Sequence, residues 1–273
     1  MQGGDRTTFR WIAGALAVAA VGSAFVGAEF DVGRLASAKA AHGGAMFLNE
    51  CWPPRHDAEF LSLLAGATLD TLAVAFLGTL LAVAIGIPLA AMSSRNVIYG
   101  ARFAAADTPP GRGARAVFVA SRTFTAMFRS VPEVVWALLF VKAAPLGALP
   151  AILAIGVAYG GLIGKVFSEQ MEDVAPSPVA ALEAVGAGRV RTFAWGVLPQ
   201  AFGPMASYAA YRFECAVRAS VLMGFVGAKG LGFELQVSYG DFLFGEVVTE
   251  TAFLIVLVIL IESASDAMRR RIA

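Results

Sequence analysis

Residues 69–92 read LDTLAVAFLGTLLAVAIGIPLAAM, and only Asp70, Thr71 and Thr79 interrupt the apolar run. A helix needs about 20 mostly apolar residues to cross a bilayer, where each backbone polar group must be hydrogen-bonded within the protein. The run is long enough to meet that requirement. It therefore predicts a membrane-spanning helix.

The composition extends this interpretation to the whole protein. Of its 273 residues, 58% are hydrophobic and 15% are charged, and the mean hydropathy is +0.70. A soluble domain carries about 25% charged residues, so lipid is the solvent for most of this chain. The formal net charge of +1 gives no field that would attract nucleic acid. The length holds about six spans with their loops and no soluble catalytic domain.

Five further apolar segments complete a predicted set of six spans. Residues 11–28 follow Arg6 and Arg10, and we interpret them as an uncleaved span because they are long and lack a clean signal-peptide cleavage site. The other segments are residues 123–141, 149–167, 201–226 and 246–263. The predicted fold class is an all-α polytopic membrane protein with about six transmembrane helices.

Two of these spans contain residues that shape helices. Pro132 lies within residues 123–141, removes one helical hydrogen bond and predicts a kink or a restart. The segment 149–167 is rich in glycine, which allows close approach of neighbouring helices in lipid. Its glycines are Gly156, Gly160, Gly161 and Gly164.

The polar segments predict the loops and three regions. Residues 1–30 form a cytoplasmic tail and the first span, residues 31–66 an extracytoplasmic segment with an amphipathic stretch, and residues 67–273 the permease core. Turn signals at His42-Gly43-Gly44 and Trp52-Pro53-Pro54 are expected to interrupt any long helix before residue 57. Residues 93–122 and 168–200 are predicted cytoplasmic loops, and residues 227–245 an external segment.

The basic residues predict the orientation. With both termini inside, five basic residues face outward: Arg34, Lys39, Arg55, Lys142 and Lys229. Fourteen lie on cytoplasmic flanks: Arg6, Arg10, Arg95, Arg102, Arg112, Arg115, Arg122, Arg129, Lys165, Arg189, Arg191, Arg269, Arg270 and Arg271. This asymmetry follows the positive-inside rule. It predicts an inner-membrane protein with both termini in the cytoplasm.

The loop 168–200 contains a short alanine-rich helix, then Gly186, a basic aromatic turn and Leu198-Pro199. Small apolar side chains on such a helix can dock into a groove of a soluble partner, and glycine permits the following turn. The interval from Gly186 to Leu198-Pro199 resembles the loop that permeases of ATP-binding-cassette (ABC) importers present to their ATPases. The residues that this resemblance assigns to ATPase coupling are Ala180, Ala181, Glu183, Gly186, Arg189, Arg191, Leu198 and Pro199.

The chain departs from the family pattern at one position of this loop. The pattern begins Glu-Ala-Ala six residues before the glycine, whereas this chain has Ala180-Ala181-Leu182 there. Glu183 lies three residues after Ala180, hence on the same helix face. We hypothesise that Glu183 substitutes for the missing glutamate.

A broader resemblance covers nearly everything from Trp52 onward. It rests on Trp52-Pro53-Pro54 and on residues 71–88 (TLAVAFLGTLLAVAIGIP), 129–140 (RSVPEVVWALLF), 196–200 (GVLPQ), 211–214 (YRFE) and 227–234 (GAKGLGFE). In this order and at these intervals the strings resemble bacterial phosphonate importer permeases. The resemblance implies the type I ABC importer permease (MetI-like) fold. It also implies a homodimer, two cytoplasmic ATPase subunits that use ATP and Mg²⁺, and an extracytoplasmic binding protein that delivers a phosphonate, phosphite or phosphate.

Charges within predicted spans are the candidate substrate pathway: Arg212, Glu214, Arg218 and Glu133. Ionisable side chains in a membrane face the protein interior or a wet cavity, and guanidinium groups suit oxyanions. Spacing predicts that Glu214 and Arg218 meet on one helix face while Arg212 is turned away. The alternative, equally open, is a set of structural ion pairs with Glu214 or Glu133. For Glu133 and Lys165 we favour structural roles.

Other motifs exclude function classes. The glycines of residues 227–232 (GAKGLG) follow no strand and precede no Lys-Ser/Thr pair, so they do not form a phosphate-binding loop. His42, His56, Cys51 and Cys215 form no metal-ligand pattern, and there is no catalytic nucleophile motif, so we expect no cofactor and no enzymatic activity in this chain.

Three alternatives to a permease for a phosphorus oxyanion stay open. They are the same architecture with another cargo (phosphate, a metal chelate or an amino acid), a secondary transporter, and an intramembrane enzyme.

Overall fold

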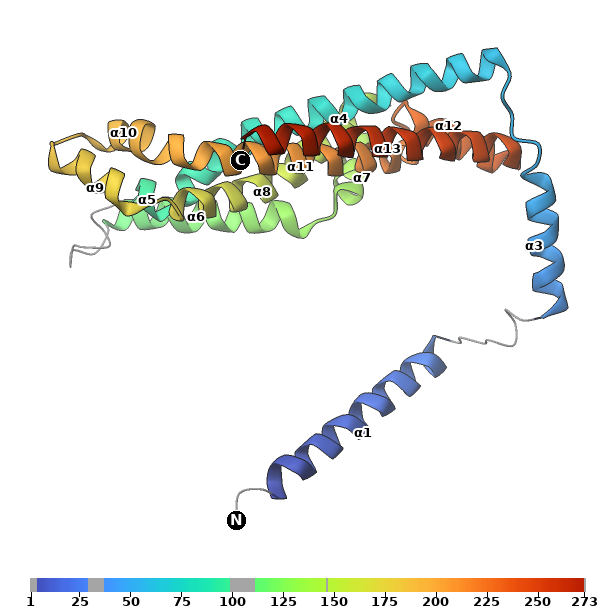
Figure 1. The fold of residues 1–273 in the computed structure, drawn as a ribbon, viewed down its shortest axis with the longest axis horizontal. Helices are drawn as coiled ribbons and strands as arrows, with labels where there is room; N and C mark the ends of the chain where they lie inside the picture. Colours follow the sequence, from blue (N-terminus) through green and yellow to red (C-terminus); the bar gives the residue numbers. More distant parts are fainter. Residues whose placement is uncertain (1–3, 29–36, 99–110, 146, 273) are drawn as a thin grey trace. The chain divides into compact units, whose positions relative to one another are not determined.

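The computed structural model describes residues 4–28, 37–98, 111–145 and 147–272, and no strand occurs in these ranges (Figure 1). The chain separates into two compact units, Met1–Trp52 and Pro53–Ala273.

The first unit consists of α1 (Gly4–Gly27) and α3 (Ala38–Glu50). The predicted first span falls within α1, whose apolar stretch Phe9–Phe25 is shorter than 18 residues. The prediction that His42-Gly43-Gly44 interrupts a helix was wrong, because α3 runs through it. Alanines flank the three residues, and a glycine costs only about 1 kcal/mol relative to alanine in a helix. The preceding part of the predicted external segment, residues 29–36, lies outside the described residues.

The second unit is built around α4 (Ala58–Ser93) and α8 (Ala148–Glu172). At 1.5 Å per residue, α4 is about 54 Å long, which exceeds the roughly 30 Å of a bilayer core. The predicted amphipathic stretch at residues 60–64 is therefore the first part of the span helix itself. Helices α4, α8, α11 and α13 run side by side along this unit (Figure 1).

The glycines of α4 and α8 hold these two helices at close range, as the sequence predicted for residues 149–167. A Cβ added at Gly86 would lie 2.5 Å from Ile163 Cγ2, and one at Gly156 would lie 2.5 Å from Leu81 Cδ2. Gly78 and Gly160 also lie in close contact with side chains of the other helix. Each helix thus inserts side chains into glycine gaps of the other, which is how helices associate without a hydrophobic driving force.

The third predicted span is broken, as Pro132 indicated. Helix α6 (Arg112–Ser130) and α7 (Glu133–Ala143) meet at an angle of 91°. The predicted loop 93–122 is only partly a loop, because α5 (Arg95–Ile98) and the first half of α6 fall within it. The arginines in the first half of α6 make this part of the sequence polar, and the polarity was interpreted as a loop. In the structure these arginines lie on a strongly amphipathic helix.

The remaining helices are α9 (Pro176–Ala184), α10 (Arg189–Thr192), one π-helical turn η2 (Phe193–Val197), α11 (Leu198–Gly224), α12 (Leu231–Gly240) and α13 (Phe244–Ile272). By length and composition, three described helices qualify as membrane spans: α4, α8 and α13. The bent pair α6–α7 makes a fourth. The six predicted spans comprise these four together with α1 and α11. Helix α11 contains three charged residues.

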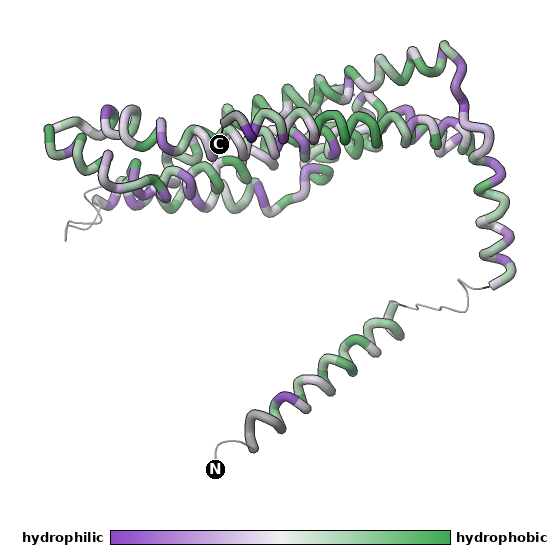
Figure 2. The backbone as a smooth tube through the Cα atoms, viewed as in Figure 1, coloured by the Kyte–Doolittle hydropathy of each residue, from purple (hydrophilic) through white to green (hydrophobic). Residues whose placement is uncertain are grey.

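The outer face of the second unit is apolar. Figure 2 shows the middle of α13 as a hydrophobic band, and Ile255, Val256, Ile259 and Leu260 there are between 54% and 62% exposed. Exposed aliphatic side chains of this density are the expected surface of a helix in lipid. The described part of the chain is therefore an all-α integral membrane protein.

Replacement of Gly86 by valine tests the glycine interface. We expect Gly86→Val to lower the free energy of unfolding by about 1–3 kcal/mol, because Ile163 has no room to move away. Gly66→Val is the matched control on the same helix, since an added Cβ at Gly66 meets nothing within 4 Å. The measurement is sodium dodecyl sulfate titration of the purified protein in mixed micelles. Equal midpoints for the two variants would contradict the interface.

Candidate functional site

The coupling segment, residues 176–199, is held at one end of the second unit by small residues. Val179 on α9 is buried and, with Leu182, packs against Gly196 of η2. A Cβ at Gly196 would lie 3.0 Å from Leu182 Cδ1, so glycine permits this contact. Gln200 Oε1 accepts a hydrogen bond of 3.2 Å from the Ala175 N–H and links the two ends of the segment.

Gly186 ends α9 in the way the sequence predicted for a turn. Its φ of 81° lies in the left-handed region that glycine adopts without strain. The Gly186 N–H donates to the Glu183 carbonyl oxygen at 3.0 Å, and the Ala187 N–H donates to that of Leu182 at 3.0 Å. These bonds cap the last carbonyls of α9 and direct the chain into α10.

The outer face of the coupling segment exposes apolar side chains. Val185, Val190 and Trp195 are 82%, 81% and 76% exposed, and Ala180 and Ala181 are exposed beside them. Helices α9 and α10 lie at the tip of the second unit (Figure 1). Strongly exposed apolar side chains gathered in one short segment are consistent with the docking role that the sequence predicted.

The remaining predicted coupling residues surround this surface. Glu183 is half-buried on α9, and Arg191 is exposed on α10. The side chain of Arg189 lies outside the described residues. Leu198 and Pro199 are the first two residues of α11, where proline is compatible with a helix start. The structure thus brings these residues into one segment.

The predicted contact between Glu214 and Arg218 was wrong. The Glu214 carboxylate is 6% exposed and accepts a hydrogen bond of 2.8 Å from Arg269 on α13. Arg218 instead donates to Glu262, also on α13, at 2.7 Å. Partners 44 and 55 residues away therefore replace the local pair, because α13 packs directly along α11.

Arg212 lies in an aromatic cage, which we call the tyrosine cage: Tyr159, Tyr208 and Tyr211. The guanidinium carbon lies 5.4, 5.0 and 5.3 Å from the three ring centroids, respectively. Arg212 Nε also donates to the Tyr208 hydroxyl at 2.8 Å. Among the described residues, no carboxylate forms an ion pair with Arg212.

A cation surrounded by aromatic faces keeps its charge. Ring quadrupoles attract a guanidinium and offset part of its desolvation, but they do not neutralise it. An ion pair, as at Glu214 and Arg269, would cancel most of the field. The tyrosine cage therefore leaves a positive centre on α11 that an anion can approach.

Glu133 is the first residue of α7 and follows Pro132 at the 91° bend. It is half-buried and lies close enough to Tyr159 to interact with it electrostatically, as does Arg212. The negative charge near a helix N-terminus is favourable, which agrees with a structural role. No contact between Glu133 and Arg212 joins them into one pair in the described structure.

The glycines of residues 227–232 form a packing corner. Gly230 has a φ of 138° and touches Thr71, whose hydroxyl oxygen accepts a hydrogen bond of 2.9 Å from the Leu231 N–H. A Cβ at Gly232 would lie 1.8 Å from the Val221 carbonyl oxygen. Close backbone approach of α12 to α11 and α4 explains these glycines without any phosphate ligand.

A polar cluster joins α12, α13 and the chain before α4. Arg55 donates to Asp57 at 2.7 Å and to Glu246 at 2.7 Å, and Ser238 donates to Glu250 at 2.7 Å. The hydrogen bond from Arg55 holds the pKa of the Asp57 carboxyl below its ordinary value. Because Arg55 and Asp57 are exposed, this pair contributes little to stability.

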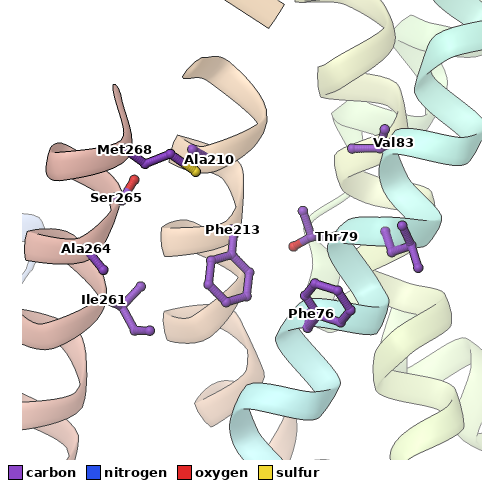
Figure 3. Close-up of a pocket in the computed structure, with 10 residues that line it drawn as sticks. Phe76, Thr79, Val83, Ala210, Phe213, Ile261, Ala264, Ser265 and Met268 are labelled. Atoms are coloured by element: carbon purple, nitrogen blue, oxygen red, sulfur yellow. The ribbon is translucent and has the colours of Figure 1, made fainter. Parts of the chain in front are cut away.

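An apolar pocket of about 430 Å³ lies between α4, α11 and α13 (Figure 3). Phe76, Phe213, Ile261 and Met268 line it, and no charged side chain does. An oxyanion would lose its hydration there without gaining a partner. In the described residues, no group of three or more His, Cys, Asp or Glu could hold a metal ion, and Cys51 and Cys215 are unpaired.

Residues 111–273 match the family described as the binding-protein-dependent transport system inner membrane component. The chain belongs to this family. Its members are the membrane subunits of ABC importers and are not enzymes themselves. They work with an ATPase and a substrate-binding protein, so the predicted partners of these two classes and the inner-membrane location are confirmed.

The chain is similar to permeases of Stutzerimonas stutzeri that are named for phosphite. The chain is 36% identical over 202 residues to the phosphite transport system permease protein PtxC, covering 74% of this chain and 68% of that protein. It is 32% identical over 223 residues to the putative phosphite transport system permease protein HtxC, covering 82% and 73%. The phosphate-import permease protein PhnE of Mycolicibacterium smegmatis is 33% identical over 219 residues, which span 80% of this chain and 38% of that protein.

Solved structures confirm the predicted type I permease fold. A structure of the MetNI methionine ABC transporter in inward-facing conformations superposes with a TM-score of 0.65 at 22% identity, covering 80% of this chain and all of that one. An amino acid ABC transporter with histidines gives a TM-score of 0.62 at 14% identity, covering 78% and 95%. At these identities the likeness concerns the fold alone.

Sequence reasoning missed the surroundings of the charges. Tyr208 and Tyr211 lie four residues and one residue before Arg212, so helix geometry could have placed Tyr208 beside it. Tyr159 on α8 and the partners Glu262 and Arg269 on α13 required the tertiary structure. No periodicity in α11 points to them.

Proposed function

We propose that this chain is the permease subunit of an ATP-driven importer that carries a phosphorus oxyanion, namely phosphite, a phosphonate or phosphate. The observation that carries the substrate assignment is the similarity, at 32% to 36% identity, to permeases named for phosphite and phosphate. The amino acid transporters share the fold at 22% identity or less, which supports no substrate.

The charge arrangement on α11 supports an anionic cargo. Glu214 and Arg218 are each bound to a partner on α13, so they act as structural links between the two helices. Of the two arginines in the predicted pathway set, Arg212 is the one without an ion pair to a described carboxylate. A guanidinium offers planar donors to an oxyanion, and a pathway that must release its cargo needs only weak contacts of this kind.

The assembly follows from the exposed coupling segment. We propose that its apolar face docks on a cytoplasmic ATPase that binds ATP and Mg²⁺, and that two copies of this permease pair with two ATPase subunits. An extracytoplasmic binding protein delivers the oxyanion with high affinity. The coupling residues are Ala180, Ala181, Glu183, Gly186, Arg189, Arg191, Leu198 and Pro199.

The basic residues support a cytoplasmic orientation of the coupling segment. Arg95 begins α5, two residues after the end of α4. Its N–H donates a hydrogen bond of 2.8 Å to the carboxylate of Glu172, the last residue of α8. This contact places the end of α4 beside the start of the coupling segment. Arg122 also donates to Glu172, at 3.1 Å, so α6 brings this arginine to the same end. We therefore propose that this end faces the cytoplasm. The basic residues beside the two termini, Arg6, Arg10 and residues 269–271, support a cytoplasmic location for both termini as well.

ATP hydrolysis by the reconstituted complex tests the proposed function. We expect hydrolysis to rise when the permease, the ATPase and the binding protein are combined with one of three anions: phosphite, methylphosphonate or phosphate. Stimulation should require all three proteins, because the binding protein signals through the permease. An intact complex that responds to none of the anions, but responds to an amino acid, would refute the substrate assignment.

Glu183→Ala tests the coupling segment. We expect about tenfold less uptake per ATP hydrolysed, the equivalent of losing one contact of about 1.4 kcal/mol at the ATPase surface. Glu59→Ala is the matched control, because Glu59 is an exposed glutamate in the first turn of α4. The complex should copurify in both variants. Wild-type coupling in Glu183→Ala would exclude its role as the substitute glutamate.

Arg212→Gln tests the pathway. We expect the maximal uptake rate to fall about tenfold or more, because a charge-assisted hydrogen bond contributes about 1.5–3 kcal/mol. Arg218→Gln should change it less than about twofold, since its ion pair with Glu262 is half-exposed. Uptake of radiolabelled anion and assembly are measured together. Loss of assembly in Arg212→Gln would assign this arginine to structure instead.

A further inference from the structure

A second polar site borders α8, apart from the tyrosine cage. It is a cavity of about 210 Å³ between α4, α6 and α8. We call it the basic cavity, and its polar lining consists of Ser93, Arg122, Thr125, Arg129, Lys165 and Ser168. One water needs about 10–15 Å³, so the space admits a small anion with part of its hydration shell.

Three cations line this cavity, and two of them form weak ion pairs with carboxylates. Arg122 pairs with Glu172 at 3.1 Å, and Lys165 pairs with Glu169 on the next turn of α8. All four side chains are between 25% and 53% exposed, and ion pairs of such exposure contribute only about 0–1 kcal/mol. An incoming anion can therefore replace a carboxylate at little cost.

Arg129 is the third cation and has no ion pair with a described carboxylate. The cavity thus holds three positive groups against two paired carboxylates, which leaves it with an excess positive charge. The hydroxyls of Ser93, Thr125 and Ser168 donate to carbonyl oxygens of their own helices. The attraction of an anion consequently depends on the three cations.

Glycine packing fixes the cavity in place. A Cβ at Gly161 would lie 2.7 Å from Phe128 Cβ and 2.9 Å from the Arg129 nitrogen. Because Gly161 has no side chain, the end of α6 lies against α8, and Arg129 and Lys165 line one cavity. Lys165 is seven residues before the end of α8, about 10 Å along the helix. The coupling segment follows at Pro176.

We propose that the basic cavity is a second, low-affinity station for the transported phosphorus oxyanion, at the end of the permease that carries the coupling segment. This inference rests on the proposed function. The tetrahedral anion exchanges with Glu169 and Glu172 for Lys165 and Arg122, and it also contacts Arg129. When it leaves, the carboxylates restore the ion pairs, so the cavity releases its cargo readily.

The same chemistry could come from the phosphate of an anionic lipid. We assign the cavity to the free anion because its lining is polar on three helices and includes the buried hydroxyls of Ser93, Thr125 and Ser168. A lipid headgroup brings acyl chains that require an apolar continuation, and the lining includes only one apolar residue, Ala126. The experiment separates the two sources.

The experiment uses the permease–ATPase complex in phosphatidylcholine nanodiscs without the binding protein. Line broadening of the ³¹P signal of free phosphite reports weak binding and requires no transport. We expect broadening with the wild type and about a tenfold weaker effect with Arg129→Gln and Lys165→Gln, as for one lost charge-assisted contact. Arg129→Lys should retain it. Lys142→Gln, an exposed cation on α7, is the control and should match the wild type.

The outcomes distinguish the two proposals. Equal broadening in all variants, or none in the wild type, would overturn the basic cavity as an oxyanion site, whatever the transport assays show. If added phosphatidylglycerol abolished the broadening of the phosphite line, the cavity would be a binding site for the lipid phosphate and not for the free anion. If phosphite binds and Arg129→Gln also lowers the maximal uptake rate without changing the half-saturating concentration, the station lies on the transport path. Binding with unchanged uptake would remove it from that path.

Discussion

The close approach of α4 and α8 positions everything else in the second unit. Gly86 and Gly156 accept Ile163 and Leu81 from the opposite helix, so the two helices interlock along several turns. In lipid this dispersion contact takes the place of the hydrophobic effect, which provides no drive between two apolar helices. Helix α8 is thereby fixed between α4, α6 and α11. It contributes Tyr159 to the tyrosine cage and Lys165 to the basic cavity.

Charge is handled in three different ways around this scaffold. Glu214 and Arg269 form a mostly buried pair that links α11 to α13. Lys165 and Glu169 form an exposed pair that contributes little free energy. Arg212 is stabilised by aromatic rings and keeps its charge. The first arrangement fits a permanent structural link, whereas the other two leave a cation accessible to an anion.

Much of the fold could be predicted from the sequence because lipid imposes simple rules. Pro132 marked the break between α6 and α7, and the glycines of residues 149–167 marked the close interface. The coupling segment was predicted around Gly186, whose left-handed conformation agrees with that turn. Prediction failed where local signals compete: two glycines did not stop α3, and arginines on α6 were mistaken for a loop.

The candidate site was less predictable, because its partners are distant in sequence. Spacing along α11 suggested Glu214 and Arg218 as a pair, but α13 offers Arg269 and Glu262 in better geometry. The sequence of a single helix predicts neither the tyrosine cage nor the basic cavity, because the residues of each come from at least two helices. Sequence periodicity describes a helix face, and it does not identify the residues that face it.

A permease must bind an anion within the membrane and still release it. Several cationic sites of low affinity therefore serve this purpose better than one site of high affinity. High affinity at any one position would slow release, because most differences in affinity arise from the dissociation rate. Arg212 offers a charge that no described carboxylate neutralises, and the basic cavity offers cations whose ion pairs are weak. Since both sites border α8, a shift of α8 relative to α6 and α11 would change both sites together. The coupling segment, which continues from the end of α8, is well placed to transmit such a shift from the ATPase.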